Sequence, residues 1–415
     1  MSTVAEYYQK LAAEMQSLRD AGTYKELRYL QTPMDAYTEM EGYGRTMIMS
    51  SNNYLGLSNH PEVKAAGKAG IDKYGAGTAS VRFICGTFDI HRELEQEIAS
   101  FLKTEACLTY VSCWSANESA IPVACGAEGV VISDELNHAS IIDGCRLIAK
   151  GVQKARYKHS DMADLEAQLQ QFPNAPVRLI VTDGVFSMEG DVAKLPEIVA
   201  LAKKYEALVM VDESHATGVI GKTGRGSAEY YGLEGQIDII SGTLGKALGG
   251  AAGGFVAGKK CFVEALIQKS RPQLFSNALP PTVACSALAA LRVLEREPER
   301  AQRLRDKATY LRNKLREAGF KPLDGDGAIV PIIVGDDAFA ISISNKLLKK
   351  GLFVTGFGFP VVPRGTARIR CQVSDALELK DLDWAVEQFK EVGKEVGLIY
   401  GFDLGGARGA RRQSL

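Results

Sequence analysis

The sequence predicts an α/β protein, with a mostly parallel, doubly wound sheet in a large domain and a smaller α+β domain after it. From Pro61 to about residue 290, short apolar runs alternate with helical patterns of about ten to fifteen residues, which is typical of such a sheet. Polar motifs follow three of the apolar runs, at the strand ends where ligands of doubly wound sheets gather. Past residue 295, charged helices and short strands replace the alternation.

The length and net charge of the chain limit the number of domains and the kinds of partner that are expected. With 415 residues the chain is long for one domain and fits two lobes around one site. The net charge of −1 indicates neither a nucleic-acid partner nor a membrane-surface partner. The N-terminus has no apolar segment of the signal-peptide type, and no apolar run reaches about 18 residues, so neither a signal peptide nor a transmembrane helix is expected.

The eight cysteines are scattered and form no CxxC pair. This spacing argues against a structural zinc site and against a disulfide framework, and no metal is expected. It fits a reducing compartment, so the sequence predicts a cytoplasmic protein.

The chain divides into four segments: 1–50, 51–290, 291–400 and 401–415. In the first, apolar residues at helical spacing over 3–20 predict a helix that docks on the body of the protein. Residues 43–50 read as a strand or hairpin, which leads into polar residues suited to the edge of a site.

In the large segment, strands are expected at 179–182, 208–211 and 237–240, with a helix over 195–206. In the small segment, a helix is expected over 298–318, strands near 329–334 and 367–373, and a helix that carries Leu382, Val386 and Phe389. The tail 401–415 is rich in Gly and Arg and aperiodic, and is expected to be mobile.

Lys246 lies in a glycine-dense turn after the third of these strands. A lysine in such a loop is most often a surface residue, and a Walker-type phosphate loop is excluded because Gly242 and Gly245 have the wrong spacing. Partial burial behind a strand would lower the pKa of the Lys246 amine and favour its neutral form. A neutral amine forms a Schiff base with a carbonyl group.

The other requirements of a pyridoxal phosphate site are also present. Asp212, at the end of an apolar strand, offers a carboxylate for the ring nitrogen, although a plain structural Asp is an equal reading. His138 offers a flat ring, although a lone histidine is more often a satisfied core residue. Candidates for the phosphate are Ser112, Cys113 and Trp114, which precede an expected helix over 115–124, together with Thr243.

Seven motifs carry a resemblance to a known family: Asn52–Leu57 (NNYLGL), Ser80–Thr87 (SVRFICGT), Asn137–Gly144 (NHASIIDG), Thr182–Met188 (TDGVFSM), Gly242–Gly250 (GTLGKALGG), Leu274–Asn277 (LFSN) and Thr355–Phe357 (TGF). From about residue 5 to residue 400, the chain resembles the α-oxoamine synthases, which are fold-type I pyridoxal-phosphate enzymes. The 80–87 motif has the form found in the acetyltransferase branch of that family.

The resemblance implies roles for the residues that contact the cofactor. Lys246 would form the Schiff base with the cofactor and later remove the Cα proton, His138 would stack on the ring, and Asp212 would pair with the ring nitrogen. His215 and Ser187 would contact the ring hydroxyl. The phosphate would be held by Ser112, Cys113, Trp114 and Thr243, with Ser276 reaching in from the second subunit of a homodimer with shared sites.

For the substrates, the resemblance implies that Arg370 and Asn52 receive the amino-acid carboxylate and that Val81 and Arg82 lie in a substrate-binding loop. Arg368 and Arg370 share one face of an expected strand, and a guanidinium suits a carboxylate, although a surface salt bridge is the plain alternative.

The activity implied is the condensation of a small amino acid with an acyl-CoA, by default glycine and acetyl-CoA, to give 2-amino-3-oxobutanoate and CoA. Trp114, Ala252 and Gly358 depart from the usual residues of the acetyltransferase branch. Another α-oxoamine synthase with a different amino acid or acyl thioester is therefore the close alternative. A fold-type I aminotransferase is a remote one, and a non-catalytic binding protein is disfavoured because Lys246 and Asp212 are both present.

Overall fold

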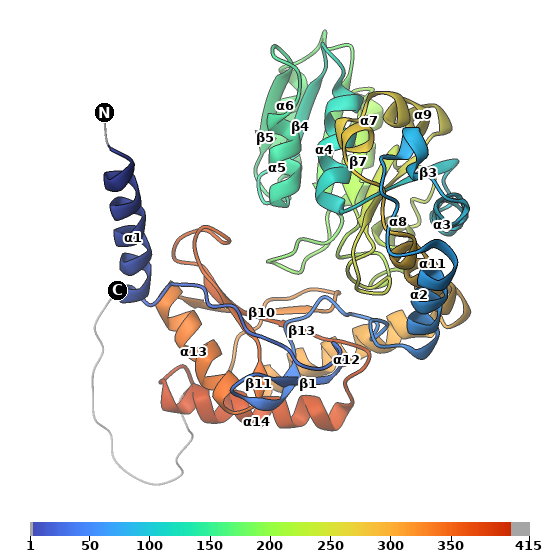
Figure 1. Ribbon diagram of the computed structural model, residues 1–415. Helices are drawn as coiled ribbons and strands as arrows, with labels where there is room; N and C mark the ends of the chain where they lie inside the picture. The colour runs from blue at the N-terminus through green and yellow to red at the C-terminus, as the bar shows by residue number, and fades with distance from the viewer. Residues whose placement is uncertain (1–2, 400–415) are drawn as a thin grey trace.

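The computed structural model describes residues 3–399 and consists of two lobes, with the large one at the top of Figure 1. The large lobe contains a seven-stranded sheet in the order β3-β9-β8-β7-β6-β4-β5. Its strands are β3 (Ala106–Tyr110), β4 (Val130–Asp134), β5 (Gln153–Tyr157), β6 (Arg178–Asp183), β7 (Leu208–Asp212), β8 (Ile239–Thr243) and β9 (Gly254–Gly258). Only β9 runs against its neighbours, so the prediction of a mostly parallel sheet is confirmed.

Helices cover both faces of this sheet (Figure 1). They are α2 (Pro61–Tyr74), α3 (Asp89–Leu102), α4 (Cys113–Cys125), α5 (Ala139–Arg146), α6 (Met162–Gln170), α7 (Leu195–Lys204), α8 (Ser227–Tyr231), α9 (Lys260–Lys269), α10 (Arg271–Phe275) and α11 (Pro281–Arg296), with a π-helical turn over Arg82–Gly86. Successive residues of β6 show why both faces are apolar: Ile180 packs in one core cluster and Val181 in the other.

The small lobe combines two three-stranded sheets with helices. Its elements are α12 (Glu299–Glu317), β10 (Ile329–Gly335), α13 (Asp337–Lys349), β11 (Leu352–Phe353), β12 (Thr355–Phe357), β13 (Ala367–Gln372) and α14 (Leu379–Glu395). The hairpin of β1 (Tyr37–Met40) and β2 (Gly44–Ile48) joins this lobe, because β2 pairs in parallel with β11. The chain before residue 50 thus contributes a hairpin to the lobe formed by its C-terminal part.

The N-terminal helix differs from its prediction in one respect. Helix α1 (Val4–Asp20) forms where the apolar spacing places it, and a capping box between Thr3 and Glu6 holds its first turn. The predicted docking on the body is wrong, because none of its residues is buried and Tyr7 and Tyr8 are 59% and 63% exposed. Figure 1 shows α1 standing apart from both lobes. Helical spacing identifies an apolar face, but it does not identify what covers that face.

The sequence also predicts that the chain has no transmembrane helix and that its C-terminal tail is mobile. Within residues 3–399, no helix combines the length and the apolar character needed to cross a membrane. The tail 401–415, expected to be mobile, lies outside the described residues.

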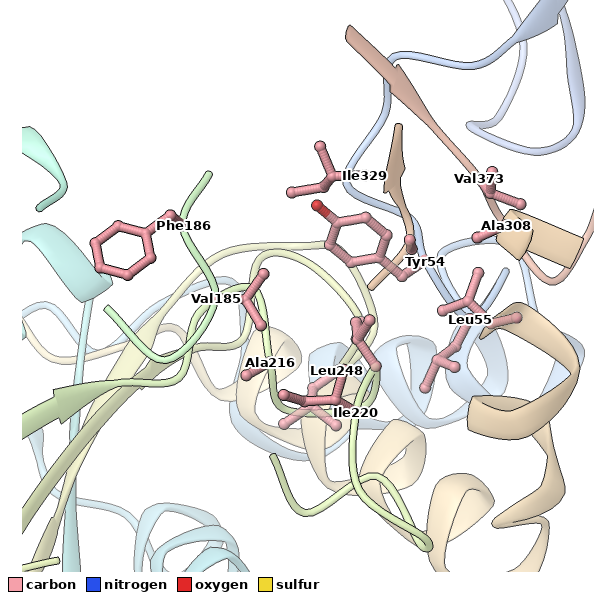
Figure 2. Packing of buried hydrophobic residues seen from close by; sticks show 14 of the residues in the cluster. Tyr54, Leu55, Val185, Phe186, Ala216, Ile220, Leu248, Ala308, Ile329 and Val373 are labelled. Atoms are coloured by element: carbon pink, nitrogen blue, oxygen red, sulfur yellow. The ribbon is translucent and has the colours of Figure 1, made fainter. Parts of the chain in front are cut away.

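Buried apolar side chains join the two lobes (Figure 2). Tyr54 and Leu55, from the segment after β2, belong to the same core cluster as large-lobe residues such as Val185 and small-lobe residues such as Ile329. Tyr54 is only 1% exposed. The segment that carries Tyr54 is therefore fixed between the lobes.

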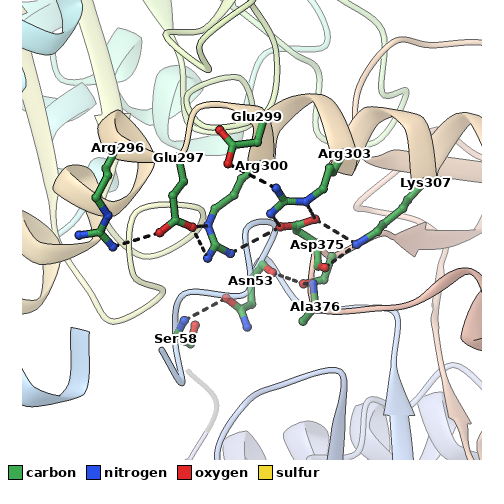
Figure 3. A network of polar contacts seen from close by, with 11 residues as sticks. Asn53, Ser58, Arg296, Glu297, Glu299, Arg300, Arg303, Lys307, Asp375 and Ala376 are labelled. Carbon is green, nitrogen blue, oxygen red and sulfur yellow. Dashed lines mark hydrogen bonds and ion pairs between the residues drawn. The ribbon is translucent and has the colours of Figure 1, made fainter. Parts of the chain in front are cut away.

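A polar cluster around Asp375 holds the same segment from the other side (Figure 3). The Asp375 side chain is 3% exposed and forms ion pairs with Arg300 at 3.5 Å, Arg303 at 2.7 Å and Lys307 at 3.0 Å, all from α12. Several cations around one buried carboxylate offset the cost of its burial. The backbone N–H of Asp375 donates to the carbonyl oxygen of Tyr54 at 2.7 Å. Helix α12 thereby fixes the backbone at Tyr54.

Candidate active site

A cavity of about 180 Å³ lies at the carboxyl ends of β6, β7 and β8. Among the candidates named from the sequence, those that line it are Cys113, Trp114, His138, Asp212, His215, Thr243 and Lys246. Ser140, Asp183, Val185 and Ser214 also line it. The first three lie within motifs named from the sequence, but none of the four was given a role there. Strands that run in parallel bring their polar ends to one edge of the sheet, which is why motifs far apart in sequence meet here.

Lys246 reaches the cavity from the turn after β8. Its Nζ atom lies 2.8 Å from the Nε2 atom of His215. The turn depends on Gly249 and Gly250, whose φ angles of +95° and +69° are unfavourable for residues with a side chain. Burial lowers the pKa of the Lys246 amine and outweighs the opposing effect of Asp212. A lowered pKa is the direction predicted for Lys246 from the sequence.

Asp212, at the end of β7, is held by neutral groups. Its carboxylate accepts hydrogen bonds from the Asn117 side-chain amide at 2.7 Å and from the Ser214 backbone N–H at 2.9 Å. The Cys113 sulfur lies 3.7 Å from one of its oxygens. These hydrogen bonds satisfy a carboxylate that is only 3% exposed and fix its oxygens at the edge of the cavity.

His138 is oriented by a short chain of hydrogen bonds. Its Nδ1 atom lies 2.7 Å from the Ser140 hydroxyl, which also accepts from Asn117 at 2.9 Å. Its backbone N–H donates to Asp183 at 3.1 Å. The Trp114 and His138 rings form a T-shaped pair with 5.9 Å between their centroids. Burial lowers the pKa of His138, so a neutral imidazole faces the cavity.

The first turn of α4 meets the cavity and suits an anion. Ser112 caps this helix, since its hydroxyl accepts the Ser115 backbone N–H at 3.1 Å. A helix N-terminus offers free N–H groups and a positive dipole, which bind phosphate. The Thr243 hydroxyl lines the cavity and donates to the Gly253 carbonyl at 3.1 Å. A Cβ added at Gly254 would lie 2.3 Å from the Cys113 nitrogen, so β9 and α4 touch backbone to backbone.

Arg370, on β13, is 8% exposed, so it does not form the surface salt bridge that was the alternative reading. Its guanidinium donates to the Ser187 carbonyl at 2.7 Å and to the Gln372 side-chain oxygen at 3.0 Å. Its Nε atom is buried and has no partner within residues 3–399. The Phe357 ring lies 4.5 Å from the guanidinium carbon. A guanidinium with an unused buried donor fits a carboxylate ligand.

The Gln372 side chain connects Asn52 to Arg370. The side-chain amide nitrogen of Gln372 donates to the Asn52 side-chain oxygen at 2.7 Å, while its oxygen accepts from Arg370. The two residues expected to receive the carboxylate are thus linked through one amide.

Four other candidates lie elsewhere. Ser187 contacts Arg370 through its carbonyl oxygen and does not line the cavity. Ser276, the C-cap of α10, also does not line it. Val81 pairs with Asn277, and Arg82 is tied to Glu95 by an ion pair of 2.7 Å with both side chains largely buried. The roles expected for these four residues stay predictions.

The residues of the cavity fit pyridoxal phosphate. A buried carboxylate, a lysine amine with a lowered pKa, a neutral histidine ring and a helix N-terminus line one space. The buried Ser241 hydroxyl and the buried Arg370 Nε have no partner within the described residues. Each chemical part of the cofactor, namely aldehyde, pyridine nitrogen, ring face and phosphate, has a matching group.

Comparison with known proteins gives relatives over nearly the whole chain. The model of the aminotransferase class I and II family matches residues 45–389. The 2-amino-3-ketobutyrate coenzyme A ligase of Escherichia coli K12 is 47% identical over 396 residues, which are 95% of this chain and 99% of that protein. The 8-amino-7-oxononanoate synthase of Symbiobacterium thermophilum is 46% identical over 391 residues, 94% of this chain and 98% of that protein.

Solved structures show the same fold. A structure described as SPT with a PLP internal aldimine superposes with a TM-score of 0.91 at 34% identity, and covers 96% of this chain and 100% of that chain. A serine palmitoyltransferase from S. paucimobilis with a bound PLP-myriocin aldimine gives a TM-score of 0.90 at 34% identity, with the same coverage of both chains.

Proposed function

We propose a function for this chain from the premise that it belongs to the aminotransferase class I and II family and, within it, to the α-oxoamine synthases. It is a pyridoxal-phosphate-dependent acyltransferase that condenses a small amino acid with an acyl-CoA and releases CoA. Glycine and acetyl-CoA are the favoured substrates, which give 2-amino-3-oxobutanoate. The observation that carries the proposal is that Lys246 and Asp212 line one cavity of about 180 Å³, while Arg370 has no carboxylate partner within residues 3–399 and is connected to Lys246 by hydrogen bonds.

The protein contributes the groups that hold the cofactor. Lys246 would bind its aldehyde, Asp212 its ring nitrogen, and His138 would cover one face of the ring. The first turn of α4 and the Thr243 hydroxyl would receive its phosphate. When bound, the cofactor supplies an electron sink that makes the Cα proton of an amino acid removable.

The side chains of Lys246 and Arg370 would then act on the Cα proton and on the orientation of the amino acid. Nζ of Lys246 would be the base that takes the proton from Cα, and burial lowers the pKa of this amine, which favours that role. Arg370 binds the carboxylate with a rigid fork, which fixes the direction of the Cα–H bond relative to the cavity. The Trp114 edge against His138 narrows the space beside Cα, which favours a small amino acid such as glycine.

The deciding experiment measures CoA release by the purified protein with pyridoxal phosphate and acetyl-CoA, while the amino acid is varied over glycine, alanine, serine, threonine and glutamate. We expect release with glycine and formation of a product with the mass of 2-amino-3-oxobutanoate. The Lys246→Ala variant is the matched control and releases no CoA above background. Release that requires a larger amino acid would contradict the glycine assignment.

A second reading is another α-oxoamine synthase that uses a longer acyl group. The observation that favours it is Gly358, which lines a second cavity of about 580 Å³ together with Phe357 and Phe359. A Cβ at Gly358 would lie 2.6 Å from the Asp337 carboxyl carbon, so a larger residue would not fit without movement. A series of acyl-CoA substrates of increasing chain length, with glycine and then alanine, separates the two readings by kcat/KM.

We further propose a homodimer with shared sites and a cytoplasmic location. Phe275, beside Ser276, is 70% exposed, and the neighbouring Phe83 and Ile84 are 60% and 68% exposed, which supports a covered face near α10. Scattered cysteines support the cytoplasm, although a relative from Bos taurus is named as mitochondrial.

A further inference from the structure

An unbroken chain of hydrogen bonds connects Arg370 to Lys246. The Arg370 guanidinium lies 3.0 Å from the Gln372 side-chain oxygen, and the Gln372 nitrogen lies 2.9 Å from the Tyr54 hydroxyl. That hydroxyl lies 2.8 Å from Nδ1 of His215, and Nε2 of His215 lies 2.8 Å from Nζ of Lys246. The chain thus runs from β13, through the segment that joins the lobes, to the turn after β8.

The chemistry of each group fixes the direction of the first links. A guanidinium only donates, so the atom of Gln372 that faces Arg370 is its oxygen. The amide nitrogen of Gln372 therefore faces Asn52 and Tyr54, and it donates to both. Since the Tyr54 hydroxyl accepts from Gln372, its own proton is directed to its other partner, Nδ1 of His215.

The reverse direction leaves a buried proton unsatisfied. If Nδ1 of His215 carried the proton, Tyr54 would accept from both partners, and its own O–H would have no acceptor within residues 3–399. Tyr54 is 1% exposed, and buried hydroxyl groups in proteins are nearly always paired.

The neutral state of His215 completes the argument. Burial, and after it the positive charges of Lys246 and Arg370, lowers the pKa of His215 well below its usual range. His138 is a further titratable group that acts in the same direction. A neutral imidazole has one N–H, and with Nδ1 accepting from Tyr54 that N–H is on Nε2. An N–H donor next to Nζ of Lys246 is compatible with an amine and not with an ammonium group.

We propose that Tyr54 and Gln372 are positioning residues that hold His215 as the tautomer with its proton on Nε2. His215 then presents a hydrogen-bond donor to the cavity and cannot act as a proton acceptor toward Lys246 whenever Lys246 is the free amine. The link from this tautomer to catalysis rests on the proposed function; the tautomer itself does not. Arg370, which is proposed to bind the amino-acid carboxylate, also orients the Gln372 amide at the start of this chain. One arginine would therefore bind the substrate and help to set the tautomer of His215.

The direct test is nitrogen NMR of the holoenzyme labelled with ¹⁵N-histidine. The chain has five histidines, and a His215→Asn variant identifies the His215 signals. We expect Nδ1 of His215 to be unprotonated and Nε2 to be protonated in the wild type. In Gln372→Glu, the new carboxylate accepts the Tyr54 proton, so Tyr54 must accept from His215. We expect the tautomer to switch to a proton on Nδ1.

Kinetics give an independent readout. Tyr54→Phe removes the donor to Nδ1, and loss of one such hydrogen bond corresponds to a fall in kcat of about tenfold. The KM for the amino acid should change less, because Arg370 is untouched. The matched control is Tyr157→Phe, since Tyr157 is also 1% exposed and its hydroxyl has no partner within the described residues. That variant should keep the wild-type kcat and His215 tautomer.

The outcomes separate this proposal from the proposed function. A wild-type His215 protonated on Nδ1, or on both nitrogens, would overturn the tautomer assignment even if CoA release is normal. An unchanged tautomer in Gln372→Glu would overturn the role of Gln372. Absence of CoA release with every amino acid, while Nε2 of His215 is protonated, would overturn the proposed function and leave the positioning role supported.

Discussion

The guanidinium of Arg368 is paired with the carboxylate of Glu189 at 2.9 Å. Arg370 lies two residues further along the same face of β13, and its guanidinium has no carboxylate partner within residues 3–399. Two buried arginines on one strand therefore differ, because a carboxylate of the protein neutralises Arg368 but not Arg370, as the proposed binding of a substrate carboxylate by Arg370 requires.

Arg370→Ala should raise the KM for the amino acid by at least about tenfold, since truncation of a buried charge that binds a ligand typically costs about 2–5 kcal/mol. The KM for the acyl-CoA should change much less. Steady-state kinetics with each substrate varied in turn measure both values. Arg368→Ala is the contrasting variant: it leaves the half-buried Glu189 without its partner and should lower stability more than it changes the amino-acid KM. Equal effects of both variants on that KM would contradict the division of tasks.

Asp212→Asn should lower kcat by about a hundredfold or more, because it removes the fixed charge that faces the cavity. Asn117→Ala removes only the 2.7 Å hydrogen bond to that carboxylate, and its effect should be smaller, about tenfold. Single-turnover rates at saturating cofactor measure both effects. If Asn117→Ala were as damaging as Asp212→Asn, the carboxylate would not be the essential group.

His159 should make stability depend on pH. Burial alone lowers its pKa, but hydrogen bonds to Asp134 and Asp191, at 3.0 Å and 3.1 Å, outweigh burial and raise that pKa to about 10. The unfolded chain releases this proton near a pH of about 6.5. The contribution is therefore fully present below that pH and is lost as the pH rises to about 10.

Denaturant unfolding at about pH 6 and about pH 10 measures this contribution. The wild type should lose stability over that interval, and His159→Gln should lose less. The same pH dependence in both proteins would show that another group causes it.

A shared site predicts that two inactive variants complement each other. Lys246→Ala lacks the amine, and Ser276→Asp places a negative charge where a phosphate is expected. In a mixed dimer, one site combines the intact Lys246 of one chain with the intact Ser276 of the other, because a C₂ interface repeats each contact. Activity should therefore appear after subunit exchange. A fully active monomer in sedimentation at the assay concentration would rule this out.

The sequence was sufficient for central strands of the large sheet and for the alternation of strands and helices around them. Strands expected at 179–182 and 208–211 lie within β6 and β7, and the helix expected over 195–206 is α7. These strands are buried on both faces of the sheet, so each appears in the sequence as an uninterrupted apolar run that is easy to recognise. Lys246 and Asp212 could be placed because each follows such a strand directly.

The polar partners of those residues could not be predicted in the same way. Asn117 reaches Asp212 from 95 positions away, and Gln372 reaches Tyr54 from 318 positions away. The packing of distant segments determines which residues form such pairs, and the spacing of residues along the chain contains no information on that packing. The only sequence signal for Tyr54 was its position within the Asn52–Leu57 motif. The docking of α1 failed for a related reason, because its apolar face carries no information on its partner.

The contact between Gly254 and Cys113 has a consequence for how this fold can acquire new substrates. The strand after Lys246 and the helix proposed to receive the phosphate touch through their main chains, so backbone geometry fixes this part of the proposed cofactor site. Arg370 and Gly358, which are proposed to face the amino-acid carboxylate and the acyl chain, come instead from the small lobe. Substitutions there can alter the substrate range without moving the cofactor frame. A redesign of specificity in this enzyme should begin with the small lobe and leave Gly254 untouched.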